Sequence, residues 1–129
     1  MKTRILLVLT ITFAAVTIAL APAWEKRSVS RGYMRQKLAY SQAVLEGLTL
    51  EKFDLVTKNA IRIRNMKLTN MFYYVKTPAY MVQVTNYHRA VDQLLNASAD
   101  KDLVRATKAY QGIVQSCVDC HRDFRSEQR

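Results

Sequence analysis

Apolar residues recur along most of the chain at intervals of three and four, which is the spacing of one face of an α-helix. Four segments have this spacing, and no segment alternates between apolar and polar residues as a half-buried strand would. The four apolar rows, in chain order, are Met34, Leu38, Leu45, Leu48; Phe53, Val56, Ala60, Ile63, Met66; Met81, Val84, His88, Val91, Leu95, with Tyr80, Tyr87 and Leu94 alongside; and Leu103, Ala106, Tyr110, Val114, Cys117, His121, Phe124. Each segment is therefore predicted to be a helix with one apolar face.

The ends of the predicted helices come from capping residues. The first helix is expected to begin near Ser30 and to end at Gly47, because glycine is favoured just after a helix. Thr49 is expected to cap the second helix. Thr77 is expected to cap the third, with Pro78 as its first residue. Four amphipathic helices with short connections predict an all-α fold, an antiparallel four-helix bundle.

The N-terminus has a different pattern. Residues 1–23 begin with two basic side chains, continue with an apolar run and finish in Ala21-Pro22-Ala23. A basic start, an apolar middle and a small-x-small end are typical of a secretory signal peptide. The alternative is an uncleaved membrane anchor through residues 5–23, for which Trp24 would be an interfacial flank. Under either interpretation, residues 24–129 form one exported, periplasmic domain.

The charge balance is strongly basic. The chain has 20 Lys and Arg against 10 Asp and Glu, a net charge of +10, and without residues 1–23 it keeps 18 basic against 10 acidic residues. Such a surface favours acidic protein partners or anionic lipid headgroups. The basic residues are scattered and do not interleave with aromatic residues, so a nucleic-acid partner is not expected.

The motif Cys117-Val118-Asp119-Cys120-His121 carries the chemistry of the chain. Cys-x-x-Cys-His is the attachment motif for haem c, in which two thiols add to the two vinyl groups of a porphyrin. The following imidazole is then available to bind the iron as proximal ligand. On a helix, residues three and four apart share one side. One helical turn is therefore predicted to hold one covalent haem and to bind its iron.

Three other interpretations of the two cysteines are weaker. A four-ligand zinc site would need both cysteines together with His88 and His121, the only histidines of the chain. A thioredoxin-like redox pair belongs next to a strand, and a disulfide across so short a loop would stabilise little. Export agrees with haem attachment, since two exported thiols would otherwise be expected to oxidise.

The segment 112–125, Gly-Ile-Val-Gln-Ser-Cys-Val-Asp-Cys-His-Arg-Asp-Phe-Arg, resembles the closing segment of the class II c-type cytochromes, cytochrome c′ and its low-spin relatives. The resemblance implies a haem motif at the end of the last helix of a four-helix bundle. It also implies His121 as proximal ligand, Phe124 against the haem edge, and Arg125 and Arg35 beside the haem propionates. The alternative for both arginines is a solvated surface position. The first helix departs from the family pattern, because it is shorter before Gly47.

The distal side of the haem decides between two functions. The resemblance implies that the first helix covers this side. If the Met34 sulfur binds the iron, the haem is six-coordinate and suited to electron transfer. If Leu38 or another apolar group covers it, the iron is five-coordinate and open to NO or CO. Met34 as an ordinary core residue is also open, and His88 is expected to be an ordinary half-exposed histidine rather than a sixth ligand.

An exported monohaem electron carrier is therefore the leading hypothesis, and a gas-binding protein is the alternative. An enzyme is not expected, because only His88 is available as a distal acid or base. A bundle built around a porphyrin is also expected to fold poorly without it, since the void would be costly. The resemblance further allows a homodimer through the first two helices, with an aromatic face formed by Tyr33, Tyr40, Phe72, Tyr73 and Tyr74.

Overall fold

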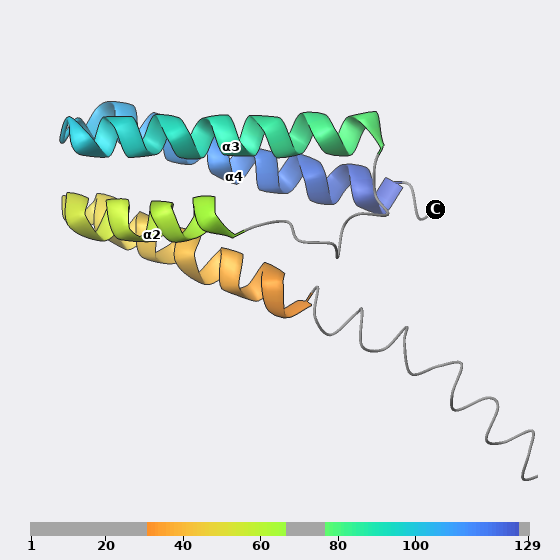
Figure 1. The fold of residues 1–129 in the computed structure, drawn as a ribbon, viewed down its shortest axis with the longest axis horizontal. Helices are drawn as coiled ribbons and strands as arrows, with labels where there is room; N and C mark the ends of the chain where they lie inside the picture. The colour runs from red at the N-terminus through yellow and green to blue at the C-terminus, as the bar shows by residue number, and fades with distance from the viewer. Residues whose placement is uncertain (1–30, 67–76, 127–129) are drawn as a thin grey trace, which may run out of the picture. The chain divides into compact units, whose positions relative to one another are not determined.

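The computed structural model describes residues 31–66 and 77–126, and all regular structure in them is helical. A first helix covers residues 31–49, followed by α2 (Phe53–Asn65), α3 (Pro78–Ala99) and α4 (Leu103–Ser126) (Figure 1). The prediction of an all-α chain with four helices is confirmed for these residues. The predicted signal peptide or anchor, residues 1–23, and Trp24 lie outside them. No helix in the described ranges is long and apolar enough to cross a membrane.

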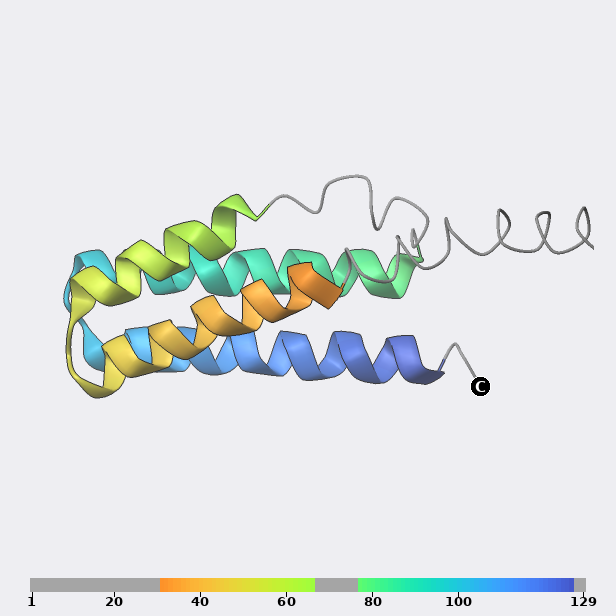
Figure 2. The ribbon, with the colours of Figure 1, turned by 90° about the horizontal axis from the view of Figure 1, so that it is seen from below.

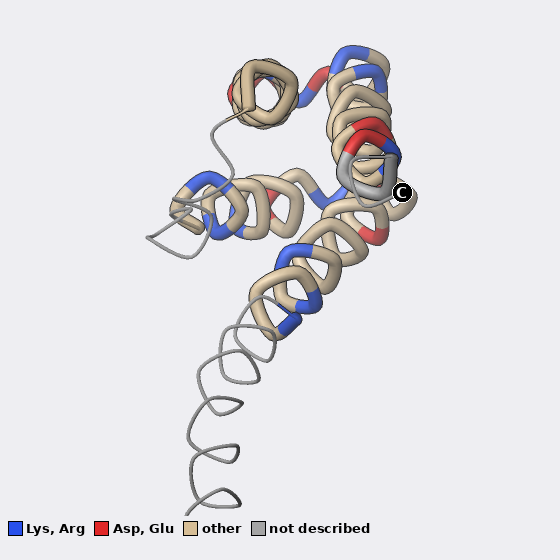
Figure 3. The backbone as a smooth tube through the Cα atoms, turned by 90° about the vertical axis from the view of Figure 1, so that its right-hand side faces the viewer, with Lys and Arg blue, Asp and Glu red and all other residues tan. Residues whose placement is uncertain are grey.

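The chain divides into two compact units, residues 1–35 and residues 36–129. In the second unit, residues 36–49, α2, α3 and α4 run alongside one another (Figures 1 and 2). Seen from the end in Figure 3, α3 lies next to α2 and α4, and residues 36–49 lie diagonally opposite α3. This is the arrangement expected of a four-helix bundle.

The buried core lies at the end of the bundle where residues 50–52 and 100–102 connect consecutive helices. All four helices contribute apolar side chains to it. These are Val44, Leu48, Val56, Ala60, Ile63, Tyr87, Ala90, Val91, Leu94, Ala97, Ala106, Ala109 and Ile113. Many of them are alanines, whose small side chains allow neighbouring helices to approach closely.

The predicted apolar row is correct for α2 and correct in part for the other three helices. In α2, Val56, Ala60 and Ile63 are buried as predicted. In the first helix, by contrast, Leu38 is 58% exposed and the inward row passes through Ser41 and Val44. The physical reason is that a helix has 3.6 residues per turn, so two neighbouring sets of residues, spaced by three or four, could each form the face that points to the core. The prediction chose the set with more large apolar residues, whereas the packing of the bundle buries the neighbouring set.

The α3 and α4 rows are correct in part, because Val91 and Ala106 are buried as predicted and Leu95, Leu103, Tyr110 and Cys117 pack against the core. In α3 the buried row runs through Tyr87, Val91 and Leu94, whereas Met81 of the predicted row is 52% exposed. In α4 the predicted member Val114 is 44% exposed, and its neighbour Ile113 is buried. In the first helix, α3 and α4, packing therefore keeps some positions of the predicted row and replaces others by a neighbouring residue.

The predicted boundary between the first two helices is wrong. The first helix continues through Gly47, and the Thr49 hydroxyl donates a hydrogen bond to the Glu46 carbonyl instead of capping α2. The N-cap of α2 is Lys52, without a side-chain hydrogen bond. A Cβ added at Gly47 would lie 2.8 Å from Cγ2 of Val56. Glycine is therefore needed here for the close approach of α2, not for ending the helix.

The two helix connections of the core end have the same backbone geometry. Glu51 and Lys101 each adopt a left-handed conformation, with φ of 51° and 54°. In the first turn Lys52 N–H donates to the Gly47 carbonyl over 2.8 Å, and in the second Asp102 N–H donates to the Ala97 carbonyl over 2.9 Å. Both turns thus satisfy carbonyls that the preceding helix leaves without an intrahelical partner.

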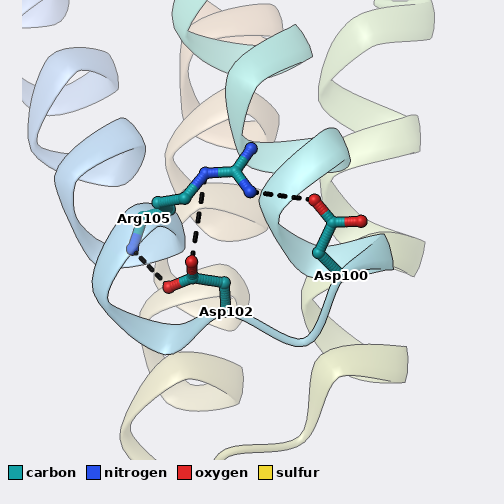
Figure 4. A network of polar contacts seen from close by, with 3 residues as sticks. All are labelled: Asp100, Asp102 and Arg105. Carbon is teal, nitrogen blue, oxygen red and sulfur yellow. Dashed lines mark hydrogen bonds and ion pairs between the residues drawn. The ribbon is translucent and has the colours of Figure 1, made fainter.

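The second connection is reinforced by side chains (Figure 4). The Arg105 backbone N–H donates to Asp102 Oδ1 over 2.9 Å, which caps α4. The Arg105 guanidinium also pairs with Asp100 Oδ2 over 2.9 Å. At the opposite end of α3 the prediction is confirmed, because Thr77 Oγ1 accepts a hydrogen bond from Tyr80 N–H and Pro78 is the first helical residue.

Candidate functional site

The haem-attachment motif lies in the second half of α4, as one uninterrupted stretch of helix. Cys117 and Cys120 are both free thiols and both half-buried, while His121 is exposed. Helical spacing sets these three groups on one side of α4, as the sequence predicted. Cys117 packs against the hydrophobic core, whereas the imidazole of His121 is accessible from solvent.

One residue next to the thiols was not predicted. Lys37 of the first helix is half-buried, and its Nζ lies 3.4 Å from the centre of the Tyr87 ring of α3. Its charge acts on the thiols of both Cys117 and Cys120. Lys37 therefore reaches from the first helix to the Tyr87 ring of α3.

The electrostatics of the site reflect this arrangement. Burial raises the pKa of the Cys117 thiol, and the positive charge of Lys37 partly opposes that rise. Burial likewise raises the pKa of the Cys120 thiol, again against the effect of Lys37. Burial lowers the pKa of Lys37, and the two cysteines oppose that change. Both thiols are thus held mainly in the neutral form at neutral pH.

Polar contacts join the outer side of the motif to its surroundings. Asp119 lies between the two cysteines, accepts a hydrogen bond from Gln115 over 3.0 Å and pairs with Arg122 over 3.1 Å. Two residues after His121, Asp123 Oδ2 accepts a hydrogen bond from Gln83 of α3 over 3.3 Å. This last contact ties the start of α3 to the motif end of α4.

The half of the bundle around the motif differs from the core end in its packing. Of the described side chains in residues 36–40, 78–86 and 117–123, none is buried. Apolar side chains here are instead exposed, among them Leu38 at 58% and Val118 at 54%. A porphyrin is a large apolar body, and this half has both the attachment thiols and apolar side chains without cover. The residues present therefore fit a haem.

The other predicted site residues fall in different places. Met34 and Arg35 belong to the unit formed by residues 1–35, where Met34 is half-buried and Arg35 exposed. Phe124 and Arg125 continue α4, and their side chains lie outside the described residues. His88 is half-buried, with its ring edge-on to Tyr87 at 5.9 Å between ring centres.

The predicted dimer face is only partly described. Tyr40 packs against the core, and the Arg62 guanidinium lies over its ring at 5.5 Å. Tyr33 is half-buried. Phe72, Tyr73 and Tyr74 lie outside the described residues. The homodimer thus stays a prediction.

No family model, curated protein or solved structure matched this chain. Within the described part of the chain, no three His, Cys, Asp or Glu side chains come together as a group able to hold a metal ion. The site is thus defined by its own chemistry. It consists of two thiols and an imidazole on α4, in a part of the bundle where no described side chain of residues 36–40, 78–86 and 117–123 is buried.

Proposed function

We propose that the chain is an exported c-type cytochrome that carries one haem on α4 and transfers electrons. The observation that supports this most is the placing of Cys117, Cys120 and His121 on one side of α4. They stand next to a half of the bundle without a buried side chain among the described residues. When bound, the haem supplies a reversible one-electron change at its iron.

The roles of the residues follow from their chemistry. The thiols of Cys117 and Cys120 would hold the haem through two thioether bonds, and the His121 imidazole would bind the iron. Phe124 would pack against the haem edge, and Arg125 and Arg35 would pair with propionates, where a guanidinium fork suits a carboxylate. The net charge of +10 would attract acidic redox partners and speed their encounter.

Met34 is the stronger candidate for the sixth ligand. It precedes Lys37 by three residues and Ser41 by seven, which is the spacing of one helical face. Lys37 is half-buried and Ser41 buried. Leu38 is 58% exposed and therefore a weaker candidate for an apolar cover over the iron. A thioether ligand favours electron transfer and raises the reduction potential.

An absorption spectrum with a carbon monoxide challenge tests the proposal. The exported protein is purified after maturation with haem, reduced with dithionite and exposed to CO. Sharp ferrous α and β bands that CO leaves unchanged are expected, because the sixth position is filled. A broad ferrous band that shifts on adding CO would overturn electron transfer in favour of NO or CO binding.

Two variants identify the ligand. Met34→Ala is expected to convert low-spin to high-spin iron and to make the ferrous form bind CO. Leu38→Ala, at a position one turn away, is the matched control and should keep the low-spin spectrum. Equal spectra for wild type and Met34→Ala would exclude Met34 as the ligand.

A further inference from the structure

One long stretch of the chain contains basic residues and no acidic ones. Between Leu55 and Val91 there is no Asp or Glu. The basic residues of this stretch are Lys58, Arg62, Arg64, Lys67, Lys76 and Arg89. At the second turn, by contrast, both signs lie together, as in the contact of Arg105 with Asp100 over 2.9 Å. Much of the positive excess of the chain therefore belongs to one stretch, which includes most of α2.

The basic side chains of α2 are on its exposed side, and they are coloured blue in Figure 3. Lys58 is three residues from Ile61 and four from Arg62, so these three exposed residues share one face of the helix. Arg64 is also exposed, and it pairs with Asp92 of α3 over 3.7 Å. Lys58 and Arg62 take part in no ion pair among the described residues. Their two charges are therefore available to a partner.

An aromatic ring holds Arg62 in place. Its guanidinium lies 5.5 Å from the centre of the Tyr40 ring, which belongs to the first helix. Tyr40 itself packs against the core, and its hydroxyl accepts a hydrogen bond from Gln36 over 3.0 Å. A guanidinium is attracted to an aromatic face, and its N–H donors remain directed outward from the edge of its plane. Arg62 thus offers a planar donor group, suited to a carboxylate, that is positioned before any partner binds.

The direction of α2 places these charges on the side of the bundle that matters for a haem. The helix begins at Phe53, beside the turn of residues 50–52 at the core end, and runs away from that turn to Asn65. Lys58 and Arg62 are in its middle and last turns. A protein that exchanges electrons with a haem must come close to it. The basic part of α2 is the part nearer to the half that contains the Cys-x-x-Cys-His motif.

The surroundings of the charges favour a protein partner over a membrane. A helix that lies in a membrane interface buries a broad apolar face among the lipids. The exposed side of α2 has a single large apolar residue, Ile61, which is 44% exposed. One apolar side chain between two cations is instead typical of a polar protein interface, in which complementary charges steer and orient the partner. The complement of Lys58 and Arg62 is a group of carboxylates.

We propose that the α2 surface, formed by Lys58, Ile61 and Arg62, is the docking site for an acidic redox-partner protein. The redox part of this inference rests on the proposed function. The overall positive charge of the chain attracts acidic proteins in general, and the α2 surface determines where they bind. Arg62 pairs with a partner carboxylate through two parallel hydrogen bonds, and Lys58 contributes a second positive charge one turn away.

Titration of the haem-loaded full chain with an oligoglutamate peptide, followed by calorimetry, tests the α2 surface. Lys58→Gln combined with Arg62→Gln removes both charges and is expected to weaken binding roughly fivefold or more. The matched control combines Lys101→Gln with Lys108→Gln, two exposed lysines at the core end and on α4. It should weaken binding less than about twofold, because exposed charges far from a contact are screened by salt.

The two double variants remove the same charge, so any difference between them reports where the peptide binds. Equal weakening would overturn the inference, since binding would then depend on total charge alone. The same proteins are mixed with vesicles of phosphatidylcholine and phosphatidylglycerol. Vesicle binding that is lost only in the Lys58→Gln, Arg62→Gln chain, without peptide binding, would assign the surface to anionic lipid and would also overturn the inference.

Lysine footprinting locates the contact in the unmutated chain. The protein is acetylated with and without the peptide, and the modified lysines are identified by mass spectrometry. The peptide should slow acetylation of Lys58 and leave that of Lys108 unchanged; equal protection of the two would contradict the α2 surface. The absorption spectrum of each sample reports the haem separately. A chain without haem that still protects Lys58 would contradict the proposed function and not the docking surface.

Discussion

The half of the bundle that contains the two turns holds all of its buried apolar side chains, whereas the half that contains Cys117 and Cys120 holds none among the described residues. The first half is closed by two turns of equal backbone geometry, at Glu51 and Lys101. The second half is held by polar contacts such as the one between Gln83 and Asp123. The comparison indicates that one half stabilises the fold, and under the proposed function the other half would hold the haem.

The two halves also differ in how their buried and half-buried polar side chains are held. In the core end, Ser98 is buried and its hydroxyl bonds to the Phe53 carbonyl over 3.1 Å and to the Thr57 hydroxyl over 2.8 Å. The buried Ser98 hydroxyl is thus paired inside the protein, as burial requires. In the motif end, the half-buried charge of Lys37 is held by an aromatic ring instead.

The largest effect is expected from removing the haem. In a Cys117→Ala, Cys120→Ala chain the motif half loses the body it is built around, so unfolding should cost at least about 3 kcal/mol less. Hydrogen exchange should be fast in residues 36–40, 78–86 and 117–123 and slower in the core end. A haem-free chain that melts cooperatively at the temperature of the haem-loaded protein would contradict the comparison.

The next largest effect is the difference in stability lost when one leucine is shortened to alanine in each half of the bundle. Leu94 is fully buried, so Leu94→Ala should lower the free energy of unfolding by about 2–5 kcal/mol. Leu38→Ala removes the same atoms from a side chain that is 58% exposed and, in haem-free protein, should cost less than about 0.5 kcal/mol. Urea denaturation of both variants measures the difference. Similar losses would show that the motif half has a core of its own.

Gly47→Ala tests the close packing of the first turn. The added Cβ would lie 2.8 Å from Val56 Cγ2 and 3.0 Å from Val56 N, so we expect a loss of about 1–3 kcal/mol. Gly112→Ala is the matched control, since its Cβ would meet Ala90 at 3.3 Å and alanine is the better helix former. Thermal denaturation should show the first variant clearly below the second. The reverse order would mean that α2 can move away from Gly47.

The smallest effect concerns the left-handed residue of the second turn. Lys101 has a φ of 54°, a conformation that is costly for residues other than glycine. Lys101→Gly should therefore raise the free energy of unfolding by up to about 1 kcal/mol, partly offset by the greater freedom of glycine in the unfolded chain. Chemical denaturation beside Lys101→Ala, which keeps the strain, measures it. A glycine variant less stable than the alanine variant would rule out strain at this position.

Much of the fold could be predicted from the sequence, and the reasons for the errors are physical. Thr77 and Pro78 were predictable because capping depends on local chemistry. The role of Gly47 was not, because it depends on how closely α2 approaches. The Cys-x-x-Cys-His motif is a local signal and could be found in the sequence. The inward position of Lys37 was missed, because lysine is polar and the adjacent apolar Leu38 was assigned to the inward row instead. The spacing of Lys37 from Met34 and Ser41 was the signal that could have found it.

The most direct test of the account is the mass of the exported, matured chain and of its α4 peptide. The account predicts that the peptide containing Cys117 and Cys120 carries the mass of one haem, bound covalently, and that a Cys117→Ala, Cys120→Ala chain carries none. A wild-type peptide with two unmodified thiols, or with a disulfide between them, would contradict it.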